Sequence, residues 1–412
     1  MYIIEAALEY FISMLSHGTY LAKITKTIGM KDSTTALLAS SVSLGVGFQI
    51  LALFISGRHS TKRWVTPVHL LNQLLFTFMY VVPLIDVSSN TKTLLICVLL
   101  ISGTAISNIA FSPKIGWLMG LVDEHKRGKF TAIKEMVSLL SGIIFTLVMG
   151  RVVDVFEARG NINGAFIVCG ITLLGLTVLH TLTLIFAKEK PKTTEEINNS
   201  SVKAQFVGIF KNKNFWTILP VLVFWSIATY ASTPFYSTYL IGELAFSMTL
   251  ISVINMAGSI TRATFSIPIG AFADRHGFSK MLYICYSLML VAFTAMIFTT
   301  PDSKYLYILY SVMHSIGMAG MNSSDLNLVL DYTSRSLRVG AIAIKGLICG
   351  FTGFFTTLAL TPLVDYIQEN GNTLFGINIY AQQVTSMISA LMCALALVYM
   401  LTVVSKLKRN AD

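Results

Sequence analysis

The sequence predicts an all-α membrane protein in which twelve transmembrane helices form two pseudo-symmetric six-helix bundles, and three observations support this fold class. The 412-residue chain is 54% hydrophobic and only 12% charged, whereas a soluble protein of this size needs more charge to cover its surface. Apolar runs of about 20 residues, each long enough to cross a bilayer, recur along the whole chain. A short pattern in the first half also returns in the second half, 211 residues later.

Twelve spans account for most of the chain, and one polar linker divides them six and six. The spans are predicted at residues 3–25, 34–56, 64–85, 92–121, 131–152, 163–187, 215–240, 246–272, 280–300, 303–330, 340–364 and 379–405. The expected domains are therefore an N-terminal bundle at 1–187, a cytoplasmic linker at 188–214 and a C-terminal bundle at 215–412. The linker is rich in Lys, Thr, Glu and Asn, and the helical spacing of apolar residues in its last part predicts a helix along the membrane interface.

The distribution of basic residues predicts the orientation of these spans. If both termini are cytoplasmic, nineteen of the 30 Lys and Arg residues fall in cytoplasmic segments, and few remain at the outer face. Such an excess follows the positive-inside rule and favours an even number of spans. We therefore expect a multi-pass protein of the inner or plasma membrane with both termini in the cytoplasm.

Charge and cysteine content exclude several other classes of protein. The net charge of +10 could indicate nucleic-acid binding, but the basic residues lie in short turns and form no patch interleaved with aromatic residues. The five cysteines are isolated within apolar segments, which favours small buried side chains over disulfides or metal ligands. The first apolar run carries Glu5 and Glu9 and has no basic segment before it, unlike a cleavable signal peptide.

The segment from Gly270 to Lys280 is a short polar turn between two long apolar runs, and its residues carry a recognisable motif. Gly270, Asp274, Arg275 and Gly277 match the pattern Gly-x-x-x-Asp-Arg-x-Gly. The first glycine permits a close helix approach and the second a tight turn, while the aspartate can accept hydrogen bonds at a helix N-terminus. By this motif the chain resembles the major facilitator superfamily of transporters, in which the motif lies in the cytoplasmic turn between helices 8 and 9. The resemblance implies that Asp274 and Arg275 hold the inward-closed state of the transport cycle by contacts with neighbouring helix ends.

Internal repetition extends the resemblance to nearly the whole chain. Arg127 and Lys134 recur as Arg338 and Lys345, and Arg127-Gly128 matches the family's Arg-Gly pair in the turn after helix 4. Two parallel six-helix halves are a known transporter architecture. The first-half turn has neither the aspartate nor the glycines of the motif, Arg338 is followed by valine, and helix 5 has no Gly-Pro pair. The chain therefore resembles the superfamily without matching one subfamily.

Charged residues inside spans are costly and are the first candidates for a binding site. Arg262 lies about 18 Å along its helix from Asp274 and shares a polar face with Asn255. Its guanidinium suits a carboxylate or phosphate, although a structural pair with a buried acid is the alternative. Lys114, a second candidate for substrate binding, and Asp325 occupy equivalent repeat positions and could form a central ion pair that opens when substrate or a proton arrives. Asp325 is then the leading candidate for proton coupling, because a buried carboxylate can titrate near neutral pH. Alternatively, Asp325 is a solvated gate residue nearer the cytoplasm.

Other polar side chains in the spans have both a functional and a structural interpretation. Lys345 could contact an anionic substrate, but we favour the alternative that its amino group extends to the cytoplasmic surface. Glu9 and His17 are further candidates for proton coupling, although a lone histidine in a span is more often a packing residue. Trp225 and Tyr236 could hold a substrate ring or make ordinary helix contacts. In the superfamily helices 3, 6, 9 and 12 are peripheral supports, and here their apolar cores contain no Asp, Glu, Lys or Arg.

The function implied by these observations is secondary active transport. We expect a monomer that moves a small organic solute, favoured to be an anion, across the bilayer by alternating access, with protons as the coupling ion. The alternatives are a drug or metabolite efflux antiporter and a membrane sensor on the same fold that transports nothing. No metal-ligand pair, nucleophile motif or cofactor loop is evident, so we expect neither an enzyme nor a cofactor, and no nucleic-acid partner.

Overall fold

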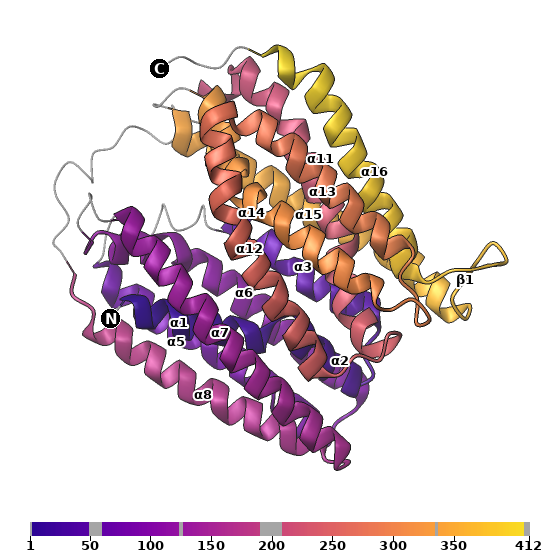
Figure 1. Ribbon diagram of the computed structural model, residues 1–412. Helices are drawn as coiled ribbons and strands as arrows, with labels where there is room; N and C mark the ends of the chain where they lie inside the picture. Colours follow the sequence, from indigo (N-terminus) through magenta and orange to yellow (C-terminus); the bar gives the residue numbers. More distant parts are fainter. Residues whose placement is uncertain (1, 49–59, 123–126, 190–207, 334–336, 408–412) are drawn as a thin grey trace. The chain divides into compact units, whose positions relative to one another are not determined.

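The computed structural model describes residues 2–48, 60–122, 127–189, 208–333 and 337–407 (Figure 1). The chain divides into two compact units, and we describe each by itself. The first contains Met1–Asn198 and Leu240–Val253, and the second contains Asn199–Tyr239 and Ile254–Asp412. The expected domain boundary at 188–214 stays a prediction, since most of that segment lies outside the described residues.

The first unit is built from long helices. They are α1 (Tyr2–Ser16), α2 (Gly18–Thr27), α3 (Asp32–Phe48), α5 (Thr61–Met79), α6 (Ser89–Met119), α7 (Arg127–Ala158) and α8 (Ile162–Phe186), with a short 3₁₀ turn η1 (Val82–Leu84) after α5. Helix α1 packs against α7 and α8, while α5 packs against α6 and α8. Four helices, α1, α5, α6 and α8, are thereby brought around one interior, which holds the site described below.

The second unit is also helical. It contains most of α11 (Lys213–Gly242) and α12 (Met248–His276), followed by α13 (Phe278–Ile297), α14 (Leu306–Tyr332), α15 (Arg338–Glu369), α16 (Ala381–Thr402) and the 3₁₀ turn η4 (Val404–Lys406). Helix α13 packs against both α14 and α16. A two-stranded hairpin, β1 (Thr373–Leu374) with β2 (Ile377–Asn378), joins α15 to α16 and was not expected from the sequence (Figure 1).

Nine helical segments in the described part of the chain are long and apolar enough to cross a membrane, and Leu306–Met321 is a shorter apolar one. They correspond to the predicted spans from the third onward. The first predicted span, 3–25, is instead divided into α1 and α2. The second, 34–56, corresponds to α3, and its last part lies outside the described residues.

The division between α1 and α2 occurs at His17 and Gly18. Gly18 has a backbone φ of 60°, a left-handed conformation that glycine adopts without the steric cost of a Cβ. The preceding His17 is extended at the start of α2, and its ring nitrogen Nδ1 lies 3.3 Å from the carbonyl oxygen of Ser13. A right-handed α-helix cannot continue through a residue in the left-handed conformation, so the first predicted span is interrupted here.

The turn between α12 and α13 has the predicted tight geometry. Gly277 has a φ of 89° and directly precedes α13. The expected close approach at Gly270 is not seen among the described residues, because a Cβ added there would meet no atom within 4 Å. The Asp274 side chain lies outside the described residues, and Arg275 is exposed. The role of this motif in the transport cycle stays a prediction.

A small apolar core lies where α1, α5, α6 and α8 meet, and the chain that follows α8 is hydrogen-bonded beside it. The buried members of this core come from these helices and from the residue after α8: Tyr2, Val65, Trp117, Leu118, Leu184 and Ala187. The Trp117 indole donates a 2.8 Å hydrogen bond to the Lys188 carbonyl oxygen, and the Glu189 carboxylate accepts from the backbone N–H of Thr61 and Lys62 at the start of α5. The first residues of the expected linker are therefore bound to the bundle.

Candidate functional site: a buried ion-pair network in the first unit

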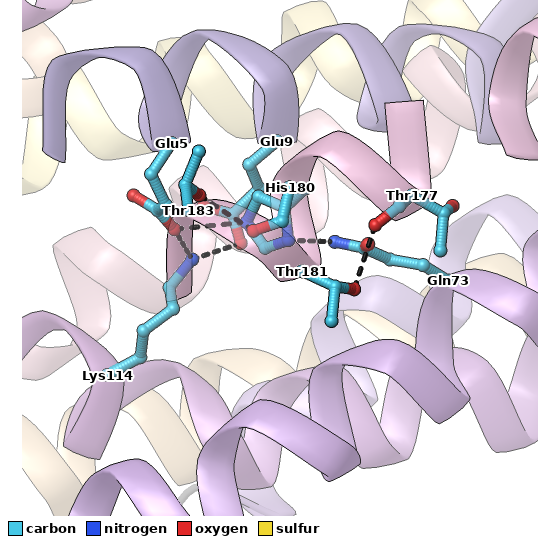
Figure 2. Close-up of polar contacts among 8 residues, drawn as sticks. All are labelled: Glu5, Glu9, Gln73, Lys114, Thr177, His180, Thr181 and Thr183. Atoms are coloured by element: carbon cyan, nitrogen blue, oxygen red, sulfur yellow. Dashed lines mark hydrogen bonds and ion pairs between the residues drawn. The ribbon is translucent and has the colours of Figure 1, made fainter. Parts of the chain in front are cut away.

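Two glutamates and a lysine meet inside the first unit. The Lys114 Nζ atom lies 2.8 Å from Glu5 Oε1 and 2.5 Å from Glu9 Oε1 (Figure 2). The side chains of Lys114 and Glu5 are 0% and 2% exposed, whereas that of Glu9 is 31% exposed. Removing charges from water costs several kcal/mol for each ion, so these short contacts are needed to hold Lys114 as a cation. Glu9 is the most exposed member of this trio.

The helices place these three residues by simple periodicity. Glu5 and Glu9 are four residues apart on α1, so both carboxylates project from one face of that helix. Lys114 directly follows Pro113 within α6. Because proline supplies no backbone N–H, the local hydrogen-bond ladder of α6 is interrupted next to the lysine. The observed side-chain contacts then join α1 to α6.

A histidine and a glutamine extend the network to α8 and α5. His180 Nε2 lies 3.1 Å from Glu5 Oε1, and the other ring nitrogen, Nδ1, lies 2.8 Å from Gln73 Nε2 (Figure 2). Both side chains are buried, His180 at 0% and Gln73 at 1% exposure. An amide nitrogen donates, so Nδ1 accepts here and Nε2 carries the proton donated to Glu5. In this arrangement His180 is neutral.

A second histidine on α5 lies beside the first. His69 is 1% exposed, and its ring centroid is 5.8 Å from that of His180. Among the described residues, neither of its ring nitrogens has a hydrogen-bond partner, and the same is true of Gln73 Oε1 and Glu5 Oε2. Buried polar atoms are normally paired, so these orphaned atoms mark an unusual interior. The network has spare hydrogen-bonding capacity at its α5 side.

The balance of charge is the main chemical property of the site. With His180 neutral, two carboxylates face one ammonium, which leaves an excess of one negative charge in a buried position. Glu5, Glu9 and His180 each offer one ligand atom, and these lie within 4.8 Å of one another, as in a metal site. The Lys114 ammonium, however, already contacts two of the three residues at hydrogen-bond distance. The cation held by these carboxylates is therefore the lysine itself.

The structure brings together two of the residues that the sequence singled out. Lys114 was a candidate for substrate binding and Glu9 for proton coupling, and both belong to this network. The ion pair expected between Lys114 and Asp325 involves a side chain outside the described residues, so that pairing stays a prediction. Within its own unit, the Lys114 ammonium pairs with Glu5 and Glu9.

Sequence reasoning missed three members of the network. Glu5 was considered only as evidence against a signal peptide, and Gln73 and His180 were not considered. Helices α5 and α8, which correspond to the predicted third and sixth spans, contribute Gln73, His69 and His180 to this interior although their apolar cores contain no Asp, Glu, Lys or Arg. Buried neutral residues that can hydrogen-bond would have been a usable signal.

Two further candidates lie on α12. Arg262 is half-buried and Asn255 is exposed. The main-chain oxygen of Arg262 accepts a hydrogen bond from the Ser266 hydroxyl at 2.7 Å. No acid is seen to pair with the guanidinium in the described part of the chain, and its binding role stays a prediction.

The aromatic candidates of α11 make packing contacts within the second unit. The Trp225 ring meets the Tyr286 ring edge-on, with centroids 5.8 Å apart. Tyr236 is 3% exposed, its hydroxyl lies 2.7 Å from the Ser386 hydroxyl, and its ring packs edge-on against Tyr310. These contacts agree with the interpretation of Trp225 and Tyr236 as ordinary packing residues. Tyr236 is almost fully buried and exposes little surface to a substrate.

The remaining candidates are not members of the ion-pair network. His17 lies at the break between α1 and α2, with its ring edge-on to Phe76 at 5.2 Å, and Lys345 is half-buried on α15. The amino group of Lys134 lies over the Tyr2 ring, 5.3 Å from its centroid. The side chains of Arg127 and Arg338 lie outside the described residues, and so do the surroundings of Gly128.

Comparison with known proteins identifies the family. The sequence model of the Major Facilitator Superfamily matches residues 6–357 of this chain, and a second match covers residues 226–411. The chain belongs to the Major Facilitator Superfamily. Membership confirms the expected fold class, a bundle of twelve transmembrane helices in two halves, and places the chain among multi-pass membrane transporters.

Solved structures of superfamily members share this fold. A nucleoside transporter, NupG, superposes with a TM-score of 0.70 at 17% identity, covering 98% of each chain. A D-xylose–proton symporter gives 0.72 at 13% identity, covering 97% of this chain and 96% of its own. A transporter of the POT family in complex with 5-aminolevulinic acid gives 0.67 at 13% identity, covering 98% and 94%. No curated protein sequence matches the chain. At these identities the similarity shows the fold and not the substrate.

Proposed function

We propose that this chain is a proton-coupled secondary transporter that moves a small organic solute across the membrane by alternating access. The observation that carries the proposal is the buried network of Glu5, Glu9 and Lys114, which holds one more carboxylate than lysine in the interior of a transporter fold. A site with one uncompensated negative charge attracts one proton. The D-xylose–proton symporter among the structural neighbours makes such coupling reasonable for this fold.

Glu9 is the leading group for proton entry. Its side chain is 31% exposed, whereas Glu5 and Lys114 are almost fully buried. When Glu9 takes up a proton, its short contact with Lys114 weakens, and the lysine is left with Glu5 as its charged partner. Loss of that contact loosens α1 from α6, two helices of the same bundle. This is how protonation could favour one conformation of the transport cycle over another.

The polar groups favour an anionic or strongly polar solute. Arg262 offers a guanidinium on the half-buried face of α12, and guanidinium groups bind carboxylates with paired hydrogen bonds. Lys114 was expected to share this role, but its side chain is fully buried and paired with two acids. We therefore assign Lys114 to coupling, while Arg262, Asn255 and Lys345 remain the proposed binding groups.

Proton movement in proteoliposomes tests the proposal even while the substrate is unidentified. A pH-sensitive dye trapped inside the vesicles reports proton entry after addition of carboxylates, sugars, nucleosides, amino acids or lipophilic cations. We expect at least one solute to carry protons with it, and we expect Glu9→Gln to abolish that proton movement. Glu157→Gln is the matched control, because Glu157 is a 51% exposed acid that also pairs with a lysine, Lys23.

The outcomes separate the candidate functions. Solute flux that persists without proton movement in the wild type would refute proton coupling while leaving transport intact. Outward exchange of lipophilic cations for protons would show the efflux antiporter, for which the excess negative charge of the network is the favourable feature. A solute that binds without any flux would show the sensor. Asp325→Asn in the same assay tests whether the repeat-equivalent acid contributes to coupling.

The location and assembly are also proposals. The distribution of Lys and Arg favours an inner or plasma membrane location with both termini in the cytoplasm. We expect a monomer, in which each chain has its own substrate pathway. Labelling of single cysteines introduced near each terminus, with a reagent that cannot cross the membrane, would report the orientation.

A further inference from the structure

The Gln73 amide gives His180 two complete hydrogen-bonding arrangements that differ by one proton. As the amide stands, Gln73 Nε2 donates to His180 Nδ1 and Gln73 Oε1 has no partner among the described residues. Rotating the amide by 180° exchanges its oxygen and nitrogen with almost no change in shape. The oxygen would then accept from Nδ1, which must carry a proton to donate. His180 already donates from Nε2 to Glu5 at 3.1 Å, so in the rotated arrangement it is an imidazolium.

The same proton corrects the charge of the surroundings. With neutral His180 the two carboxylates outnumber the single ammonium, and the buried network carries an excess negative charge. With protonated His180 the four groups sum to zero. Buried charges are tolerated when they are paired and hydrogen-bonded, so the second arrangement is electrostatically complete. The arrangement with neutral His180 buries three charged groups instead of four, but it leaves one carboxylate without a cation.

The groups that face His180 come from three helices besides its own. Glu5 and Glu9 on α1 each offer a carboxylate oxygen within 4.8 Å of the ligand atom of His180. Gln73 and His69 lie on α5, and Lys114 on α6 contacts both carboxylates. The nearest neighbour with unpartnered nitrogens is His69, 5.8 Å away between ring centroids.

We propose that His180 is a second proton-binding site of this protein, and that rotation of the Gln73 amide is the switch that accommodates the proton. The inference rests on the proposed proton-coupled function and deepens it, since it adds a group that can receive the proton entering at Glu9. When the network holds the proton on His180 instead of Glu9, the Glu9 carboxylate keeps its contact with Lys114. The two states place the proton on a partly exposed acid or on a fully buried base, and the total charge of the network is the same in both.

Nitrogen-15 spectroscopy of histidine-labelled protein in nanodiscs reads this site directly. The chemical shifts of the ring nitrogens distinguish a singly protonated ring from an imidazolium, and loss of a signal in His180→Gln assigns it among the seven histidines. Across a pH series we expect His180 to change from one form to the other. A His180 that keeps one protonation state from pH 4 to pH 9 would overturn the proposal.

Two substitutions at Gln73 test the switch with opposite expected signs. Gln73→Glu supplies only acceptor oxygens, which favour the imidazolium form of His180. At any fixed pH the ratio of imidazolium to neutral ring should therefore rise about tenfold. Gln73→Leu removes the hydrogen bond that Gln73 makes in either arrangement, and because the charge-assisted bond to the imidazolium is the stronger of the two, that ratio should fall severalfold. Asn72→Leu is the matched control, because this neighbouring buried amide instead donates to the Gly103 carbonyl oxygen, and it should leave the ratio unchanged. If both Gln73 variants shift the ratio in the same direction, or neither shifts it, the switch is refuted.

The spectra are recorded without substrate, so their result is independent of transport. A protein whose His180 titrates as expected, but which moves solute without protons, would refute the proposed coupling and leave the proton site established. If proton-driven transport is found while His180 stays in one state, the transporter assignment stands and this site is excluded. Gln73→Met, which preserves side-chain length without an acceptor oxygen, provides a second variant if Gln73→Leu does not fold.

Discussion

At the scale of single residues, Lys114 is the most deeply buried charge of the ion-pair network. Its ammonium is fully buried and contacts carboxylates from two positions of α1. A buried charge that loses its partner is far more costly than a pair replaced as a whole. The stability of the bundle should therefore respond strongly to changes at this residue and in a manner that depends on its partners.

We predict that Lys114→Met destabilises the protein by about 3 kcal/mol, because it leaves two carboxylates without a cation in the interior. Thermal unfolding of the purified protein in detergent measures the effect as a lowered transition temperature. The double variant Glu5→Gln with Lys114→Met removes one of the stranded charges and should recover part of the loss. Equal stability of the single variant and the wild type would show that the network is solvated and not buried.

At the scale of the structural element, the break between α1 and α2 is set by one backbone conformation. Gly18 adopts a φ of 60°, which costs an L-residue with a Cβ roughly 1 kcal/mol or more. A Cβ at this position would meet no atom within 4 Å, so crowding does not contribute to the cost. The effect of a substitution there reports the backbone alone.

We predict that Gly18→Ala lowers the stability of the protein by about 1 kcal/mol. Gly175→Ala is the matched control, since Gly175 lies within α8 in ordinary helical geometry and its added Cβ would also meet open space. That control should leave stability unchanged or raise it slightly, because alanine is the better helix former. Denaturant unfolding of both variants gives the comparison, and equal effects would contradict the backbone explanation.

A second element-scale prediction concerns the start of α12. The two carboxylate oxygens of Asp154 on α7 accept hydrogen bonds from the backbone N–H groups of Met248 and Thr249, at 2.9 and 2.8 Å. A carboxylate at a helix N-terminus satisfies free donors and interacts favourably with the helix dipole.

We predict that Asp154→Ala exposes these donors and costs about 1 kcal/mol, with faster amide hydrogen exchange in the first turn of α12. Asp154→Asn keeps one acceptor and should retain part of the protection. Asp302→Ala serves as a control, since Asp302 lies in the loop before α14 and makes none of these contacts. Unchanged exchange in both Asp154 variants would show that the capping contacts are not maintained in solution.

At the scale of the whole molecule, ligand binding should be visible as stabilisation. A solute that binds only the folded protein raises its free energy of unfolding by RT ln(1 + [L]/Kd), which is about 2.7 kcal/mol at a concentration of one hundred times Kd. We predict that thermal unfolding against carboxylates, sugars, nucleosides, amino acids and lipophilic cations will identify an anion or polar solute as the stabilising ligand.

Arg262→Ala decides whether that solute is held by the proposed guanidinium. Stabilisation by an anion should be lost in this variant, while the unfolding temperature without ligand should change little, because Arg262 is half-buried and is not seen in an ion pair in the described part of the chain. Stabilisation by cations that persists in the variant would make Arg262 structural and favour the efflux alternative.

The sequence alone determined the class of the protein. Apolar runs of bilayer length, sparse charge and the Gly270–Gly277 motif identified a helical transporter fold, because the membrane imposes span length and composition on every helix separately. Such constraints act along the chain and do not depend on which helices touch. The candidates Lys114 and Glu9 were found in the same way, as charges that a membrane interior disfavours.

Only the tertiary structure decided how the site is assembled. Glu5, Gln73 and His180 lie on three different helices, and their hydrogen bonds depend on how α1, α5 and α8 pack side by side. Contacts between residues as far apart as Glu5 and His180 leave no periodic mark in the sequence, because each residue is compatible with its own helix wherever its partner lies. The partners of Lys114 were therefore a matter of packing, which periodicity and composition do not contain.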